Sequence, residues 1–270
     1  MCVGSKMESF LQRLKSMLKV DFRRMFTIPF FYIMVGIALV APILILVMTS
    51  MMDGTVSINP QTGTETIMEG FDNVWQIFGA LSSEGAQGAG MSMDLVSMCN
   101  INMLFFAVGV LVCIFVSDDF RSGYAKNLFA VRAKKTDYVV SKTMVGFVGS
   151  ACMFIAFFVG AMIGGAVSAL PFEMQGFNAF NVFCSMLSKI LLSSVFVGVC
   201  VLAGVIGKSR AWLSVVLSVG IGMLFFTMIP MVTPLDSNII NVILCLAGGI
   251  MLSTGLGAIS NVVLNKTSLV

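Results

Sequence analysis

Residues 118–142 read DDFRSGYAKNLFAVRAKKTDYVVSK and form the longest charged segment between two strongly apolar runs of the chain. The segment carries six basic and three acidic residues, whereas only 11% of the whole chain is charged. A connection with this charge needs water on at least one side, while its apolar neighbours need lipid. We therefore interpret residues 118–142 as a cytoplasmic loop of a membrane protein.

The composition of the whole chain supports a membrane protein. It has 270 residues, of which 58% are hydrophobic, whereas soluble domains keep roughly a quarter of their residues charged. Its apolar runs are continuous, unlike the alternating strands of a membrane barrel, and each is close to the ~20 residues that span a bilayer. We expect an all-α integral membrane protein with six transmembrane helices, at Ile28–Thr49, Asn100–Ser117, Thr143–Ala169, Ser188–Gly207, Trp212–Ile229 and Ile239–Leu264.

The distribution of Lys and Arg predicts the orientation. If six helices alternate, 15 of the 16 basic residues fall on one side, in the N-terminal segment, residues 118–142, the fourth connection and the tail. The other side holds most of the acidic residues and, near it, only Lys189. Basic residues accumulate on the cytoplasmic side, so we expect both termini to be cytoplasmic. We expect Lys189, at the outer end of its span, to extend toward the lipid headgroups.

Residues 1–27 precede the first predicted span and are expected to form a cytoplasmic amphipathic helix. Phe10, Leu14, Leu18 and Phe22 share one face at helical spacing, with basic residues on the other. Such a helix can lie in the membrane interface. The alternative is a generic basic flank that only sets the topology.

The remaining segments divide into a membrane domain at residues 28–264 and a short cytoplasmic tail at 265–270. Residues 52–97 form an external loop with six carboxylates and no Lys or Arg, and residues 67–81 predict a short helix on the outer surface. Gly160 and Gly164 have the spacing that allows membrane helices to approach closely.

Several kinds of chemistry are not supported by the sequence. The chain has no histidine, which excludes a His-dependent base or a histidine-ligated zinc protease. Gly207-Lys208-Ser209 lacks the glycine that a Walker A loop needs five residues earlier, because Leu202 stands there. Metal, haem and nucleic-acid motifs are not found. We expect no enzyme activity, no cofactor bound by this chain and no nucleic-acid partner.

Residues 118–142 show an ordered pattern: an acidic pair, then Phe-Arg-x-Gly, Lys-Asn-Leu, a basic cluster, and a tyrosine before the next span. This pattern resembles the first cytoplasmic loop of type-2 ABC transporter permeases (the ABC-2 family), the export class that includes lantibiotic-immunity, bacitracin-resistance and multidrug permeases. The predicted N-terminal helix, six spans and long first external loop also fit that family. The short external connection at Pro230–Asn238 departs from many members.

The resemblance implies a permease subunit in the bacterial plasma membrane that works with a second permease, identical or paralogous. ATP and magnesium would bind a separate ABC ATPase subunit, and a coupling helix in this loop would contact it. The residues implied in coupling are Asp118, Asp119, Arg121, Gly123, Lys126, Asn127, Arg132, Tyr138 and Lys142.

Three functional hypotheses follow. The first is an exporter of an amphipathic substrate such as an antimicrobial peptide, a hydrophobic drug or a lipid, conferring resistance, immunity or secretion. The second is a non-transporting sensor or assembly subunit that docks a cytoplasmic protein through the same loop. The third, an intramembrane enzyme, is disfavoured because no carboxylate lies within a predicted span.

Overall fold

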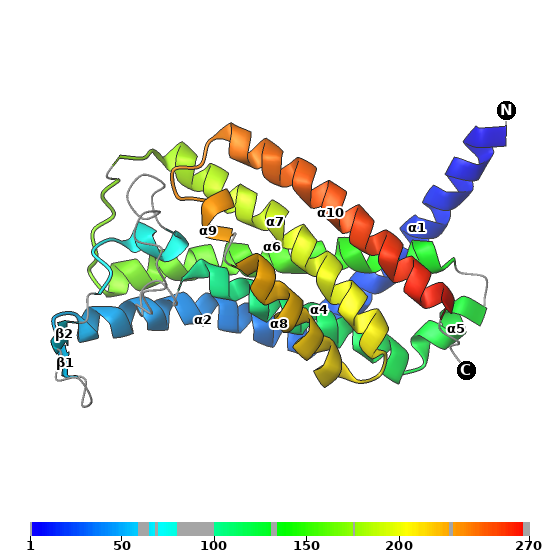
Figure 1. Cartoon of the computed structure of the whole chain (residues 1–270), viewed down its shortest axis with the longest axis horizontal. Helices are drawn as coiled ribbons and strands as arrows, with labels where there is room; N and C mark the ends of the chain where they lie inside the picture. The colour runs from blue at the N-terminus through cyan, green and yellow to red at the C-terminus, as the bar shows by residue number, and fades with distance from the viewer. Residues whose placement is uncertain are drawn as a thin grey trace.

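The computed structural model describes residues 2–58, 65–67, 70–79, 100–130, 134–174, 176–226 and 229–266 (Figure 1). Within these ranges the chain is helical apart from one short hairpin and connecting turns. The helices are α1 (Cys2–Thr27), α2 (Pro29–Met52), α4 (Leu104–Arg121), α5 (Tyr124–Ala130), α6 (Lys135–Val167), α7 (Ala179–Gly207), α8 (Ala211–Phe226), α9 (Ile229–Val232) and α10 (Ile239–Lys266).

The long helices run roughly along one axis (Figure 1). One end of the bundle, which we call the hairpin end, carries the antiparallel strands β1 (Val56–Ile58) and β2 (Glu65–Ile67) and the 3-10 helix η1 (Val74–Phe78). A second 3-10 helix, η2 (Ile101–Met103), leads into α4. The opposite end carries α5 and the end of α10, and we call it the α5 end.

Five helices are long and apolar enough to cross a membrane: Pro29–Met52, Ile101–Arg121, Lys135–Val167, Ala179–Gly207 and Ile239–Lys266. The prediction of a helical protein compatible with several membrane passages is thereby confirmed. The predicted span at 212–229 corresponds to α8, which has 16 residues. A helix of that length covers roughly 24 Å, less than the ~30 Å hydrocarbon core. A full sixth span stays a prediction, as does the orientation of the termini.

Two of the spanning helices continue through charged residues beyond their predicted boundaries. The second predicted span was expected to end at Ser117, but α4 continues to Arg121. The third was expected to begin at Thr143, but α6 begins at Lys135. The predicted spans stop where charged residues begin, because such residues lower the hydropathy. In the structure several of these charges form ion pairs, so the helices continue through them.

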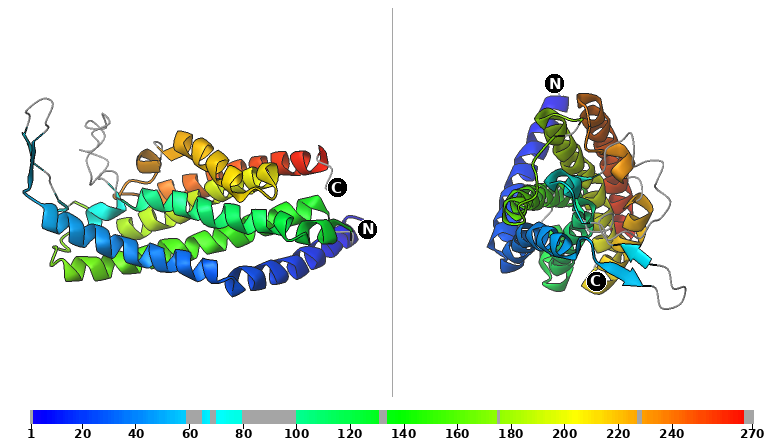
Figure 2. Two further views of the ribbon diagram at one scale, coloured as in Figure 1. Left: turned by 90° about the horizontal axis from the view of Figure 1, so that it is seen from below. Right: turned by 90° about the vertical axis from the view of Figure 1, so that its left-hand side faces the viewer.

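The bend between α1 and α2 occurs at Ile28, whose backbone is extended while Pro29 begins the next helix. Proline is tolerated at the first helical position because its missing N–H is not needed there. The Ile28 amide still donates to the Arg24 carbonyl at 3.2 Å. The helices therefore meet at a bend without a loop between them, as Figure 2 shows.

The packing of α2 against α6 depends on small residues. A Cβ atom on Gly160 would overlap the Leu39 carbonyl and lie 2.8 Å from the Pro42 side chain. A Cβ on Gly164 would lie 2.9 Å from the Cα of Ile43. The two glycines thus allow the backbones of α2 and α6 to touch, as close helix packing requires.

Candidate functional site

A cluster of four charged side chains lies at the α5 end, between α1, α4 and α6. The ammonium of Lys142 lies 2.9 Å from the Asp21 carboxylate and 2.7 Å from the Asp119 carboxylate. The guanidinium of Arg24 lies 2.6 Å from the other oxygen of Asp119. Two positive and two negative charges therefore balance. We call Asp21, Arg24, Asp119 and Lys142 the ionic cluster.

Hydroxyl groups from α6 complete the bonding of both carboxylates. Tyr138 donates to Asp119 at 3.0 Å, and Ser141 donates to Asp21 at 2.6 Å. The side chains of Asp21, Asp119 and Lys142 are fully buried. Ion pairs in such surroundings are held only where geometry is good and the remaining bonding positions are filled. Here α1, α4 and α6 each supply part of that geometry, so the cluster fixes their relative positions.

Aromatic rings cover the two cations. The Phe115 ring lies 4.1 Å from the Lys142 ammonium, and the Tyr124 ring, the first residue of α5, lies 4.0 Å from the Arg24 guanidinium. A cation over an aromatic face is attracted by the ring's quadrupole, whose face is partially negative. This contact attaches α5 to the ionic cluster.

The electrostatics at α1 and α5 agree with this arrangement. Burial by itself lowers the pKa of Arg24, but the charge of Asp119 and its hydrogen bond raise that pKa above the ordinary value. Burial raises the pKa of the Tyr124 phenol, and the negative charge of Asp21 adds to the effect. Arg24 therefore remains charged and Tyr124 neutral at physiological pH.

A second ion pair joins α1 to α6 nearer the N-terminus. Arg13 lies 3.1 Å from Asp137, whose carboxylate is almost completely buried. The side of α1 that faces the bundle carries the buried residues Met17, Asp21 and Met25. One stripe of α1 is therefore bound to α6 and not to lipid.

The predicted apolar face of α1 lies beside that stripe. Leu18 and Phe22 are partly buried and pack against the core, while Phe10 and Leu14 are partly exposed. Leu11 is 56% exposed. Contact between this face and the membrane interface stays a prediction. The half of the face that is nearer α2, with Leu18 and Phe22, packs against the protein core.

The predicted coupling residues separate into two groups. Asp119, Tyr138 and Lys142 are buried and bond to residues of the same chain, so they hold the loop in place from inside. The exposed group comprises Arg121, Lys126 and Asn127, with Gly123 and Asp118 partly exposed. Arg132 lies outside the described residues.

Gly123 provides the turn between α4 and α5. Its φ is +74°, a conformation that residues with a Cβ rarely adopt. The ideal Cβ position has no atom within 4 Å, so the requirement is conformational and not one of space. The Asn127 amide donates to the Gly123 carbonyl at 3.1 Å, which begins α5.

The sequence pattern did not predict a site that includes Asp21, Arg24 and Ser141. A signal was present, because Asp21 interrupts the apolar spacing of Leu14, Leu18 and Met25. An acidic residue on an apolar face of a basic helix indicates a buried cationic partner. The identity of that partner, 121 residues away, required the structure.

The hairpin end differs from two expectations. The helix expected on the outer surface is η1, whose Val74, Trp75, Ile77 and Phe78 are buried, because these apolar side chains fill the end of the bundle. The Trp75 indole donates to the Phe172 carbonyl at 3.1 Å. The expectation that Lys189 extends to the headgroups is wrong: its side chain is fully buried and donates to Thr233 at 2.7 Å.

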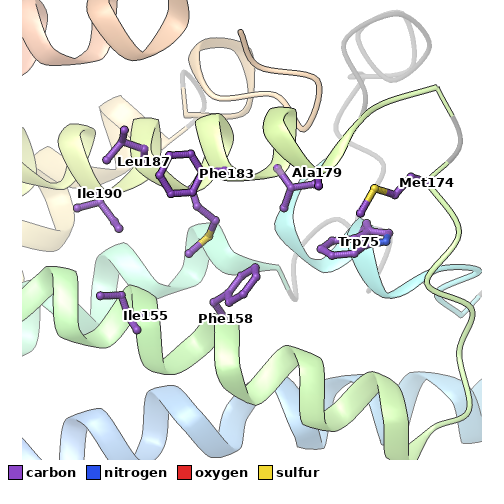
Figure 3. A pocket seen from close by; sticks show the side chains of 10 residues that line it. Trp75, Ile155, Phe158, Met174, Ala179, Phe183, Leu187 and Ile190 are labelled. Carbon is purple, nitrogen blue, oxygen red and sulfur yellow. The ribbon is translucent and has the colours of Figure 1, made fainter. Parts of the chain in front are cut away.

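An apolar crevice of ≈ 420 Å³ lies between α6 and α7 at the hairpin end. Figure 3 shows Phe158 of α6 and Phe183 of α7 on its two sides and Trp75 of η1 beside its hairpin-facing part. Phe183 is 63% exposed, so the crevice opens toward the surface that lipid would cover. We call this the α6–α7 crevice.

Within the part of the chain that the structure describes, no group of three or more His, Cys, Asp or Glu side chains is placed to hold a metal ion. Comparisons of the chain with protein-family models, with curated proteins and with solved structures found no match.

Proposed function

We propose that this protein is the membrane-spanning permease subunit of an ATP-driven exporter in the bacterial plasma membrane, with both termini cytoplasmic. A separate ABC ATPase subunit hydrolyses ATP, and a second permease completes the transporter. The observation that carries the proposal is the arrangement of α5: a short exposed helix attached to the ends of two long helices and, through the ionic cluster, to α1.

The surface of α5 suits an acidic partner. Lys126 and Asn127 are exposed on α5, and Arg121 is exposed at the end of α4. Charge complementarity of this kind speeds association and selects partners. Exposed cations at the end of a bundle also arise from topology alone, so the charge supports the proposal only together with the attachment of α5 to the core.

Attachment gives α5 a route for transmitting force. Tyr124 contacts Arg24, Arg24 bonds Asp119 at the end of α4, and Lys142 at the start of α6 bonds both Asp119 and Asp21. A displacement of α5 by a closing ATPase would therefore move α1, α4 and α6 together. Rigid-body movement of packed helices is a common way to change access across a membrane.

The proposed substrate is amphipathic, as an antimicrobial peptide, a hydrophobic drug or a lipid would be. The chain contains 22 methionines and 23 phenylalanines, side chains that adapt to varied apolar shapes. The α6–α7 crevice is lined by residues of this type, including Phe158, Phe183 and Met186.

Copurification from the native host tests the proposal. The protein is purified in mild detergent, and associated proteins are identified by mass spectrometry in wild type and in the double variant Arg121→Glu/Lys126→Glu. We expect a soluble ABC ATPase with its own Walker A motif to copurify with wild type and to be lost from the variant. Lys15→Glu, another exposed basic residue, is the control and should retain the ATPase.

Absence of any ATPase under conditions that preserve the membrane complex would overturn the exporter proposal. Copurification of a different soluble protein that depends on the same residues would instead favour the sensor or assembly subunit.

A further inference from the structure

The chain buries two lysines, and their surroundings differ. Lys142 has two carboxylates within 3 Å. Lys189, on α7, bonds the carbonyl and the hydroxyl of Thr233, both at 2.7 Å. No carboxylate among the described residues lies within ion-pair distance of Lys189. A buried cation without an anion is costly, and such residues within membrane helices commonly mark binding sites or pathways.

One buried hydroxyl on the same face of α7 as Lys189 is available to bond an anion. Ser185 lies one helical turn before Lys189, and its buried hydroxyl has no hydrogen-bond partner among the described residues. The Cys245 thiol of α10 lies close to Lys189 as well. Thr233 supplies two oxygens, but neither carries a full charge. Among the described residues, no carboxylate therefore pairs with this ammonium.

The α6–α7 crevice and Lys189 both lie beside η1. Trp75, in the first turn of η1, lines the crevice, while a Cβ atom on Gly79, directly after η1, would lie 3.8 Å from the Lys189 ammonium. Val182 and Met186, on the turns of α7 before Lys189, also line the crevice. The apolar crevice and the buried lysine are thus both next to η1 and to neighbouring turns of α7.

We propose that the hairpin end binds an anionic membrane lipid. Its acyl chain occupies the α6–α7 crevice, and its phosphate pairs with Lys189 and Ser185. Charge complementarity selects this occupant, because a neutral or zwitterionic lipid leaves the ammonium without a net counter-charge. Lys189 is fully buried and its ammonium lies next to Gly79 at the end of η1, so binding includes a displacement of η1. Lipid binding here uses the crevice that also suits the proposed substrate, but it requires neither ATP nor an ATPase and does not rest on transport.

The two tryptophans of the chain make the proposal measurable. Trp75 is 8% exposed and lines the crevice, whereas Trp212 is 65% exposed on α8. The variant Trp212→Phe leaves Trp75 as the sole fluorophore, shielded from most bulk lipid. It is placed in nanodiscs of phosphatidylcholine. One set also contains brominated phosphatidylglycerol and the other brominated phosphatidylcholine, and the brominated acyl chains quench tryptophan on contact.

We expect brominated phosphatidylglycerol to quench Trp75 at a lower mole fraction than brominated phosphatidylcholine. In Lys189→Met the preference should disappear, with an apparent affinity for phosphatidylglycerol roughly tenfold lower, or ~1.4 kcal/mol. Lys208→Met removes a cation from the α5 end and should leave the preference unchanged. Thermal unfolding of each variant establishes that it is folded, and methionine at position 189 removes a buried charge without removing the apolar stem.

Three results would overturn the proposal. Equal quenching by the two lipids would show that the headgroup is not recognised, and a preference that survives in folded Lys189→Met would exclude that ammonium. Relief of quenching by inorganic phosphate in the buffer would assign the pocket to a water-borne anion. None of these results depends on whether an ATPase copurifies, so this proposal and the exporter proposal can fail separately.

Discussion

The ammonium of Lys142 on α6 lies 2.9 Å from the carboxylate of Asp21 on α1, with both side chains fully buried. These residues are 121 positions apart, and their contact joins the N-terminal helix to the membrane bundle. Whatever moves the α5 end must carry α1 with it, because separating these two helices would leave charges buried without partners.

Removal of the cation of this pair should be strongly destabilising. Lys142→Met leaves Asp21 buried without its cationic partner, and breaking a buried pair in this way costs ~3–5 kcal/mol. Chemical unfolding in detergent measures the loss, and Lys126→Met, at an exposed lysine, should cost less than about 0.5 kcal/mol. Adding Asp21→Asn to Lys142→Met should recover part of the stability. Equal stability of Lys142→Met and wild type would show that the pair does not form.

Glycine at position 160 should be required for the α2–α6 interface. Gly160→Ala introduces a Cβ that would overlap the Leu39 carbonyl, so the helices must separate. Overpacking of this kind costs ~1–3 kcal/mol. Gly255→Ala on α10 is the matched control, because a Cβ there meets no atom within 4 Å. Thermal unfolding of the two variants should therefore differ clearly, and similar midpoints would contradict the close approach.

The turn at Gly123 should tolerate asparagine better than alanine. The φ of +74° places a Cβ close to a backbone oxygen, and this conformation costs ~1–2 kcal/mol of stability for most residues. Asparagine adopts this conformation more readily than alanine does. Unfolding measurements should rank the variants as glycine, asparagine, then alanine. If alanine proves as stable as glycine, the left-handed turn before α5 is not present.

Stability at high pH should depend on Tyr124. Burial and the charge of Asp21 raise its pKa in the folded protein. The folded state therefore favours the neutral phenol more strongly than the unfolded state does. This contribution is complete below the unfolded pKa near 10 and is lost as pH rises through the folded pKa. Between pH 9 and about 11, wild type should therefore lose stability more steeply than Tyr124→Phe. Parallel curves would show that the phenol is not buried beside Asp21.

Cysteine labelling tests the orientation. In a cysteine-free background, Lys126→Cys on α5 and Asp72→Cys before η1 place thiols at exposed positions at opposite ends of the bundle. A reagent that cannot cross membranes should label position 72 in intact cells and position 126 only after lysis. The reverse pattern would place α5 outside and remove the basis for its contact with a cytoplasmic ATPase.

The sequence alone determined the membrane character and the positions of the long helices, because hydropathy is a property of successive residues and needs no partner. It also indicated Gly160 and Gly164, since their spacing places both on one helical face. It placed charged residues at the helix ends but could not say which would face water. Asp119 and Lys142 were therefore grouped with Arg121 and Lys126, although the first pair is buried and the second exposed.

Only the tertiary structure decided how the charges are partnered. Lys142 ends a charged segment and Lys189 stands alone beside an apolar run, but neither local pattern identifies the residues that bond each lysine. The fold brings α1 and α4 to Lys142 and supplies two carboxylates. It brings Thr233, after α9, and the end of η1 to Lys189, where the described residues supply no carboxylate. Electrostatic pairing depends on distances between segments far apart in the sequence, and those distances arise only when the helices pack.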